Sequence, residues 1–225
     1  MSGLIALIGG NEFRRECEPM DRALLARLGV APKIVIVPTA AAHENPRLAA
    51  ENGVRYFRRL GAQAEAALVV DADTARQASR VEQIRPAGLI YFTGGDPVYL
   101  LETLVATPAW QAALDVLRRG GAIAGSSAGA MVCGGQMWSP GRGWRAGLGL
   151  VPHVAVIPHH ATLAARWNAE RMRATLPAEI TLVGIDEATA LIGSSRNWQV
   201  IGSGAVVVYR GESTAIFKEG QDVRL

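Results

Sequence analysis

Ala122-Ile-Ala-Gly-Ser-Ser-Ala-Gly-Ala130 predicts a buried strand that turns directly into a helix. Gly125–Ala130 contains only Gly, Ser and Ala, and it matches the pattern G-x-S-x-G. In this pattern a sharp turn strains the backbone at the central serine and exposes its hydroxyl, so the neighbouring residues must be small. Ser127 is therefore a candidate nucleophile. The same pattern also fits a turn that only packs tightly, or one that binds an anion at a helix N-terminus.

Apolar runs alternate with longer amphipathic segments before and around this turn. Strands are predicted at Leu4–Ile8, Lys33–Val37, Ala67–Val70, Gly88–Phe92 and Ala122–Gly125. Helices are predicted between them at Phe13–Leu28, Asn45–Leu60, Ala75–Ile84 and Pro97–Arg119. Such alternation is typical of an α/β fold with a mostly parallel central sheet and helices on both faces.

The last quarter of the chain has a different pattern. Short runs separated by Gly, Ser and Asn predict strands at Ile180–Ile185, Thr189–Ile192, Trp198–Ile201, Ala205–Tyr209 and Thr214–Phe217. Closely spaced short strands predict an antiparallel C-terminal extension of the sheet. No linker or repeat interrupts the chain, so residues 1–225 are expected to form a single domain.

The composition excludes several classes of protein. Hydrophobic residues make up 49% and charged residues 19% of the sequence, which is an ordinary globular balance. The net charge of +3 is not clustered and does not favour nucleic-acid binding. Cys17 and Cys133 are too few for a disulfide framework. Without a basic leader region or an apolar run of about 20 residues, we expect a cytoplasmic protein that binds no membrane. No cofactor is expected, and a homodimer is left open.

Three of the four histidines follow the Ser127 turn, in Pro152-His-Val-Ala-Val-Ile-Pro-His-His160. Val154–Ile157 predicts another strand, which places His159 and His160 at its carboxyl end, where functional groups gather in open α/β sheets. A base for the serine is therefore expected at this point. Adjacent histidines on an extended chain point apart and no carboxylates flank them, so no metal site is predicted.

Chain order restricts the acid of a catalytic triad. An α/β-hydrolase places its acid between the serine and the histidine, but no Asp or Glu lies between Ser127 and His159. The best-placed carboxylates are Asp186 and Glu187, which follow the apolar run Ile180–Ile185. Because side chains alternate along a strand, only one of the two can face the histidine.

A Gly-Gly turn follows another predicted strand, at Gly94-Gly95-Asp96-Pro97. Asp96 is expected to cap a helix that begins at Pro97. The turn also exposes backbone N–H groups of the kind that stabilise an oxyanion during acyl transfer.

The chain resembles the peptidase E/cyanophycinase family of serine peptidases in five motifs that occur in the same order: T-G-G-D at Thr93–Asp96, G-x-S-A-G-A at Gly125–Ala130, G-L-G-L at Gly147–Leu150, P-H at Pro158–His159 and G-I-D-E at Gly184–Glu187. The resemblance implies a class I glutamine amidotransferase-like fold and hydrolysis through a serine acyl-enzyme. It further implies these roles: nucleophile Ser127, base His159, orienting acid Glu187, and an oxyanion hole formed by the backbone of Gly95 and Ala128.

The sequence departs from the family where specificity is set. Some dipeptidase E-like members have a triad Asp after the elbow, but Cys133–Ala146 contains no acid. The D-Q-H of cyanophycinases is Ile157-Pro158-His159 here, and Arg166 and Arg171 are offset from the arginine that recognises an N-terminal aspartate. The leading hypothesis is a dipeptidase E-like serine peptidase of short peptides. The alternatives are a cyanophycinase-like β-aspartyl peptide hydrolase, an amidase or esterase, and a non-catalytic amidotransferase-like binding protein.

Candidates for substrate binding come from the segments around these motifs: Asp96, Arg142, Arg145, His160 and Arg166. The loop Trp138–Arg145 combines arginines, which bind carboxylates, with tryptophans, which offer apolar or cation–π contact. We expect this loop to cap a small pocket, the alternative being a surface loop with two packed tryptophans. In the family, the position of His160 usually holds an aromatic packing residue.

Replacing the candidate nucleophile tests the turn directly. Ser127→Ala should abolish hydrolysis without unfolding the protein, since loss of a triad nucleophile lowers turnover on the order of 10⁶-fold. Ser126→Ala, one residue earlier, should lower turnover by less than about tenfold. A Ser127→Ala protein that keeps a tenth of wild-type turnover would refute the assignment.

Overall fold

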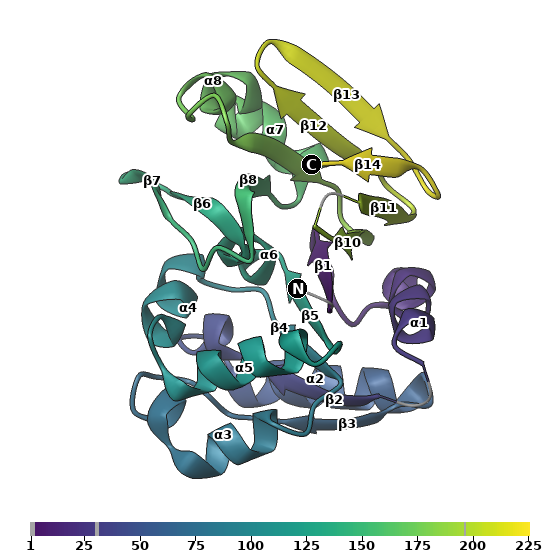
Figure 1. Ribbon diagram of the computed structural model, residues 1–225, viewed down its shortest axis with the longest axis vertical. Coiled ribbons are helices and arrows are strands. Elements are labelled where there is room, and N and C mark those ends of the chain that lie inside the picture. Colours follow the sequence, from purple (N-terminus) through teal and green to yellow (C-terminus); the bar gives the residue numbers. More distant parts are fainter. Residues whose placement is uncertain (1–2, 30–31, 196) are drawn as a thin grey trace.

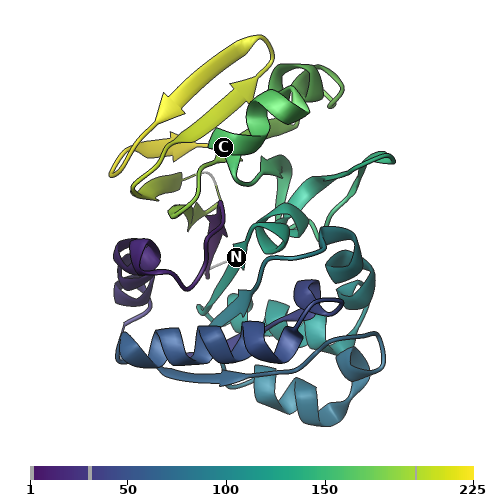
Figure 2. The same ribbon diagram turned by 180° about the vertical axis from the view of Figure 1, so that it is seen from behind.

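The computed structural model describes residues 3–29, 32–195 and 197–225, and it confirms the predicted α/β fold (Figures 1 and 2). Within these residues, the larger sheet has eight strands in the order β14-β11-β10-β1-β5-β4-β2-β3. Its parallel strands are β1 (Leu4–Ile8), β2 (Lys33–Val37), β3 (Gln63–Ala66), β4 (Leu89–Phe92) and β5 (Ala122–Ser126). Its antiparallel strands are β10 (Thr189–Ser194), β11 (Asn197–Gly202) and β14 (Asp222–Arg224).

A smaller sheet lies above the larger one in Figure 1, with the order β13-β12-β9-β8-β6-β7. Its strands are β6 (Gly134–Ser139), β7 (Gly143–Ala146), β8 (Val151–Ile157), β9 (Thr181–Ile185), β12 (Val206–Arg210) and β13 (Ser213–Phe217). β8 is parallel to both β6 and β9, and the other pairs are antiparallel. The predicted C-terminal extension is therefore divided between two sheets: β10 and β11 extend the larger sheet, while β9 and β12 belong to the smaller one.

Helices cover both faces of the larger sheet. On one face lie α1 (Glu18–Arg27) and α2 (Pro46–Arg59), and on the other lie α3 (Ala78–Ile84), α4 (Pro97–Leu104), α5 (Pro108–Arg118) and α6 (Ala128–Cys133). The helices α7 (His160–Trp167) and α8 (Ala169–Ala174) pack against the smaller sheet. Alternate residues of a strand enter different cores: Ile5 and Leu7 of β1 belong to one apolar cluster, and Ala6 and Ile8 to another. Both faces of these strands are buried, which is why the strand sequences are almost continuously apolar.

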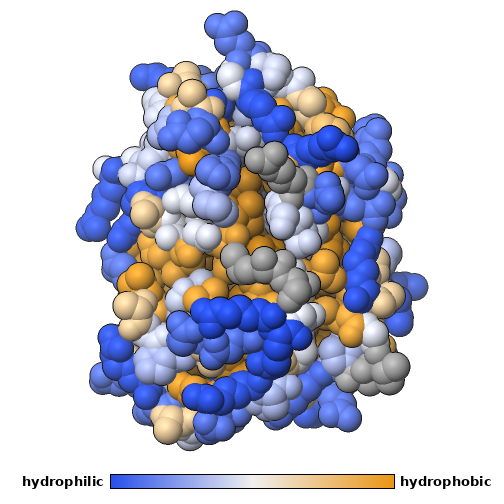
Figure 3. All heavy atoms as spheres, in the orientation of Figure 1, coloured by the Kyte–Doolittle hydropathy of each residue, from blue (hydrophilic) through white to orange (hydrophobic). Residues whose placement is uncertain are grey.

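Hydrophilic and apolar residues gather on different parts of the surface. In Figure 3 hydrophilic residues cover much of the outer part of the visible face, and apolar residues show near the middle, where the two sheets approach each other. No helix within the described ranges has both the length and the apolar character needed to cross a bilayer.

The predicted strand at Ala67–Val70 is wrong. The strand is Gln63–Ala66, which pairs with β2 at the edge of the sheet, where Lys33 forms an ion pair with Glu65 at 2.8 Å. An edge strand exposes part of its surface and therefore tolerates polar residues. Its sequence then lacks the continuous apolar run by which the other strands are predicted. Ala67 and Val69 are buried all the same, in an irregular segment that follows the strand.

Three of the predicted helices differ in extent. The helix predicted at Ala75–Ile84 begins at Ala78, after a 3₁₀ turn at Thr74–Arg76. The segment Pro97–Arg119 forms α4 and α5, because Pro108 begins a new helix with Thr107 as its N-cap. The helix predicted from Phe13 begins at Glu18, after a short 3₁₀ turn at Arg15–Cys17. Proline is disfavoured in a helix interior but favoured in the first turn of a helix. Pro19 therefore marks the start of α1, and Pro108 marks the start of α5.

A carboxyl group is buried between α1 and α2. Asp21 is 1% exposed, and its Oδ2 accepts a hydrogen bond of 2.7 Å from the Tyr56 hydroxyl. Its other oxygen has no hydrogen-bond partner among the described residues. Burial raises the pKa of Asp21 to about 7, although the bond from Tyr56 acts in the opposite direction.

This buried acid makes stability depend on pH. The unfolded chain releases the proton of Asp21 near its ordinary pKa, whereas the folded protein keeps it until about pH 7. Folding is therefore progressively disfavoured between about pH 4 and pH 7, by at most about 1.4 kcal/mol per pH unit. Denaturant unfolding should show Asp21→Asn gaining stability relative to wild type across this window. The exposed control Asp73→Asn should not gain stability in this way. If the free energies of unfolding of wild type and Asp21→Asn vary with pH in parallel, the prediction is contradicted.

Candidate active site

The predicted strand-to-helix turn is present at Ser127, between β5 and α6. Ser127 has φ 49° and ψ −108°, a backbone conformation that non-glycine residues rarely adopt. The glycines around it are required by close contacts. A Cβ on Gly125 would lie 2.3 Å from the Gly129 carbonyl oxygen, and a Cβ on Gly129 would lie 2.6 Å from that of Phe92. The turn thus places the serine hydroxyl at the carboxyl edge of the sheet.

His159 and Glu187 meet Ser127 at this edge. His159 follows β8, and its Nε2 lies 3.0 Å from Ser127 Oγ. Glu187 follows β9, and its Oε1 lies 3.1 Å from His159 Nδ1. β8 and β9 are parallel neighbours, so their carboxyl ends place the imidazole and the carboxylate side by side. The structure therefore brings together the three residues that the family resemblance implies as a triad.

The imidazole is also fixed through its backbone. The His159 N–H donates to the Gly9 carbonyl at 2.8 Å, and a Cβ on Gly10 would lie 2.2 Å from His159 Cε1. The Gly9-Gly10 pair after β1 thus leaves the space that the ring occupies. Sequence reasoning missed this pair, although two glycines directly after a buried strand are a signal of close approach.

The electrostatic state of Glu187 suits an orienting acid. Burial alone would raise the pKa of this carboxyl, but its own backbone N–H, the hydrogen bond and charge of His159 and a hydrogen bond from Thr162 lower the pKa below its ordinary value. The carboxylate is therefore ionised at neutral pH and can accept a hydrogen bond from His159 Nδ1–H, which leaves Nε2 free to accept a proton.

The neighbouring pair His160 and Asp186 faces away from Ser127. His160 is 8% exposed, and its Nε2 lies 2.7 Å from the Tyr209 hydroxyl. Its Nδ1 lies 3.5 Å from Asp186 Oδ1. Burial lowers the pKa of His160, with Asp186 acting against this effect. The two adjacent acids thus face opposite ways, and His160 packs in the interior of the smaller sheet.

The Gly-Gly turn lies beside the serine. A Cβ on Gly94 would be 3.3 Å from Ser127 Cβ, and one on Gly95 would be 2.2 Å from the Ala40 carbonyl oxygen. The Asp96 carboxylate accepts hydrogen bonds from the N–H groups of Val98 and Tyr99 at 2.8 and 3.1 Å, as expected of an N-cap.

Two backbone donors near the serine are free within the described part of the chain. The N–H of Gly95 has no hydrogen-bond acceptor there. Ala128 is the first residue of α6, so its N–H has no partner in the helix. Both are the groups that the resemblance implies for the oxyanion hole.

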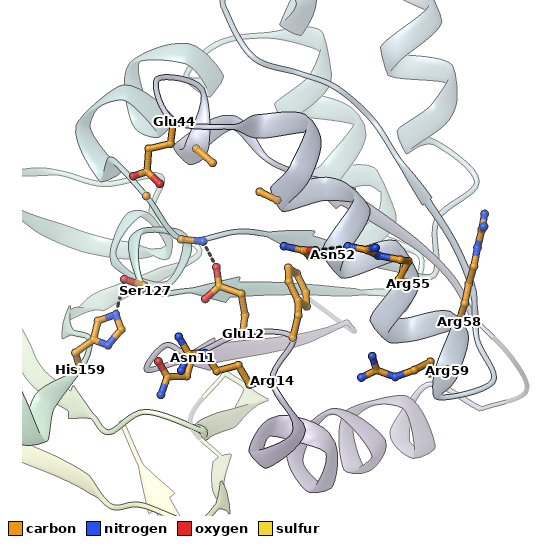
Figure 4. Close-up of a pocket in the computed structure, with 15 residues that line it drawn as sticks. Asn11, Glu12, Arg14, Glu44, Asn52, Arg55, Arg58, Arg59, Ser127 and His159 are labelled. Atoms are coloured by element: carbon orange, nitrogen blue, oxygen red, sulfur yellow. Dashed lines mark hydrogen bonds between the residues drawn. The ribbon is translucent and has the colours of Figure 1, made fainter.

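A cavity of about 1140 Å³ opens at Ser127 (Figure 4). Ser127 and His159 lie at one side of it, next to Glu12. Gly94 and Gly95 also line the cavity. Arginines line much of the remaining wall: Arg14, Arg55, Arg58 and Arg59. Sequence reasoning missed Glu12 and Arg14, which lie in the segment after β1. It also missed Arg55, Arg58 and Arg59, because α2 shows the charge pattern of an ordinary solvated helix face. Only the tertiary structure turns that face toward the serine.

The expected capping loop is a β-hairpin of the smaller sheet, formed by β6 and β7. The rings of Trp138 and Trp144 pack with centroids 5.2 Å apart, and Arg145 forms an ion pair with Glu102 at 3.0 Å. Arg142 is exposed at the hairpin turn, and Arg166 is exposed on α7. None of these three arginines lines the cavity at Ser127. The hairpin thus corresponds to the alternative, a surface segment with two packed tryptophans.

An α/β fold with a serine at a strained strand-to-helix turn is typical of serine hydrolases. The sequence profile of peptidase family S51 matches residues 4–201, and the chain belongs to this family. Membership supports a peptidase of the peptidase E/cyanophycinase type with peptide substrates, and it confirms the resemblance found in the sequence.

Two solved structures are similar over nearly the whole chain. A peptidase from an acI-B1 Actinobacterium is 31% identical with a TM-score of 0.89, covering 100% of this chain and 98% of that one. A protein proposed to be a peptidase E, from Listeria monocytogenes EGD-e, is 16% identical with a TM-score of 0.60, covering 96% and 98%. At this identity the second likeness shows the fold alone. Among curated proteins, none matches the chain significantly.

The two adjacent acids offer a matched test of the site. Glu187→Gln should lower kcat by roughly 10³- to 10⁴-fold, because an amide at this position favours the wrong histidine tautomer. Asp186→Asn, which alters the carboxylate beside His160, should change kcat by less than about tenfold. Steady-state kinetics of both variants, with circular dichroism as a folding check, measure the difference. A larger loss of kcat from Asp186→Asn would reverse the assignment.

Proposed function

We propose that this protein is a serine peptidase that hydrolyses short peptides through an acyl-enzyme on Ser127. The observation that carries the proposal is the pair of distances at His159: 3.0 Å from Nε2 to Ser127 Oγ and 3.1 Å from Nδ1 to Glu187 Oε1. Nucleophile, base and orienting acid within hydrogen-bond reach of one another are the arrangement that activates a serine hydroxyl.

Each step of the reaction has a group in the site. His159 takes the Ser127 proton as Oγ attacks the substrate carbonyl carbon, and Glu187 stabilises the imidazolium that forms. The N–H groups of Gly95 and Ala128 then hold the oxyanion of the tetrahedral intermediate. His159 gives the proton to the leaving amine, the C–N bond breaks, and the acyl group stays on Ser127. Water, activated by the same histidine, releases it.

The cavity supports small, charged peptides as substrates. A volume of about 1140 Å³ accommodates a few residues, and guanidinium groups bind carboxylates in a bidentate manner. Arg14 is exposed, and its side chain has no hydrogen-bond or ion-pair partner among the described residues. We infer that this part of the wall, rather than the hairpin arginines, receives a carboxylate of the peptide, which favours a dipeptidase E-like enzyme.

Active-site labelling and peptide screening test the proposal together. A phosphonofluoridate should label the wild-type protein once, at Ser127, and leave Ser127→Ala unlabelled, as read by intact-protein mass spectrometry. A dipeptide library should contain substrates that only the wild type cleaves. Labelling without cleavage of any peptide would favour amidase or esterase chemistry. No labelling would contradict the catalytic assignment and favour a non-catalytic binding protein.

A further inference from the structure

A carboxylate with no catalytic step assigned to it lies beside the nucleophile. Glu12 follows β1 and its side chain is half-buried in the wall of the cavity (Figure 4). Its Oε1 accepts a hydrogen bond of 2.7 Å from the Gly94 N–H, and its Oε2 accepts one of 2.7 Å from the Ser126 hydroxyl. Glu12 therefore connects the Gly-Gly turn to the residue preceding the nucleophile.

The carboxylate is close to Ser127 itself. A Cβ built on Gly94 would lie 3.0 Å from Glu12 Oε1 and 3.3 Å from Ser127 Cβ, so one small group separates them. No Lys, Arg or His of the described residues lies within 4 Å of Glu12 to form an ion pair. The other charged or titratable groups that share the cavity are Arg14, Glu44, Arg55, Arg58, Arg59 and His159.

A lone negative charge at this point opposes the chemistry. The tetrahedral intermediate carries an oxyanion held beside the same turn, and like charges at close range repel each other. A positive charge on the substrate would remove this conflict. Each carboxylate oxygen of Glu12 has used one acceptor position, so both retain a lone pair for a further donor.

The free N-terminus of a peptide has the required charge and position. In an N-terminal residue the ammonium nitrogen is about 2.5 Å from the carbonyl carbon, as bond lengths and the angle at Cα dictate. When Ser127 attacks that carbonyl, the ammonium group must lie within a few ångströms of the serine, in the region of Glu12. An internal peptide bond has an uncharged amide nitrogen at the same point.

We propose that Glu12 binds the free α-ammonium group of the substrate, so that the enzyme removes the first residue of a peptide and rejects N-acylated ones. This specificity role rests on the proposed peptidase function of Ser127. Glu12 would thus place the first carbonyl, rather than a later one, against the nucleophile and its oxyanion donors.

The variant Glu12→Gln separates this role from a structural one. Glutamine can still accept from the Gly94 N–H and can donate to the Ser126 oxygen, so the turn keeps its hydrogen bonds while the charge is lost. Two substrates are compared: the best dipeptide amide from the library, and its des-amino analogue, in which hydrogen replaces the ammonium group. Glu16→Gln, an exposed glutamate four residues away that does not line the cavity, is the charge-matched control.

The ratio of kcat/KM for the two substrates is the readout. Wild type and Glu16→Gln should prefer the free amine by at least about 100-fold, and Glu12→Gln should lower that preference at least tenfold. The preference of the wild type for the free amine should also weaken above about pH 8, where an α-amino group loses its proton. The remaining preference of Glu12→Gln should not change with pH in this range. A preference that Glu12→Gln keeps, with both substrates slowed equally, would overturn the proposal and leave Glu12 a structural residue.

Binding to the inactive protein separates this proposal from the peptidase function. Calorimetry with Ser127→Ala should show the free dipeptide amide binding at least tenfold more tightly than its des-amino analogue, and Ser127→Ala/Glu12→Gln should show no such difference. If wild type cleaves no peptide but this difference is measured, the ammonium site stands and the peptidase function fails. Equal binding of the two ligands to Ser127→Ala, or no binding of either, would overturn the ammonium site.

Discussion

The backbone turn at Ser127 is the constraint around which the site is organised. Its φ of 49° is unfavourable for a serine, and such a conformation persists only where surrounding structure holds it. Here the Ser127 N–H donates to the Ile8 carbonyl at 3.0 Å, and every residue of α6 is buried. β5 lies between β1 and β4, so the turn is supported from both sides of the sheet.

The rest of the site depends on how the two sheets meet at this turn. The larger sheet supplies Ser127 and the Gly94-Gly95 turn, and the smaller sheet supplies His159 and Glu187. The hydrogen bond from the His159 N–H to Gly9 joins the two at the point where the imidazole reaches the serine. Any displacement of one sheet relative to the other would therefore separate the nucleophile from its base.

Strand geometry separates two similar pairs of residues. His159 with Glu187 faces the cavity, whereas His160 with Asp186 is turned into the smaller sheet toward Tyr209. The first carboxyl has a lowered pKa because it accepts hydrogen bonds, and the second histidine has a lowered pKa because it is buried. The two histidines therefore differ in environment although they are adjacent in the sequence, and the same is true of the two acids.

The sequence by itself predicted the strand-to-helix turn at Ser127 and most of the parallel strands. It also predicted a base at one of two adjacent histidines and an acid at one of two adjacent carboxylates, from which the family resemblance selected His159 and Glu187. These features depend on local rules: apolar runs, glycines beside a strained residue, and side chains at strand ends. It did not determine the edge strand Gln63–Ala66, because partial exposure removes the apolar signal. Only the tertiary structure decided the division into two sheets and the contact of Glu12 with Gly94 and Ser126. The same holds for the arginine-lined wall, since residues far apart in the chain become neighbours only when the sheets and α2 pack together.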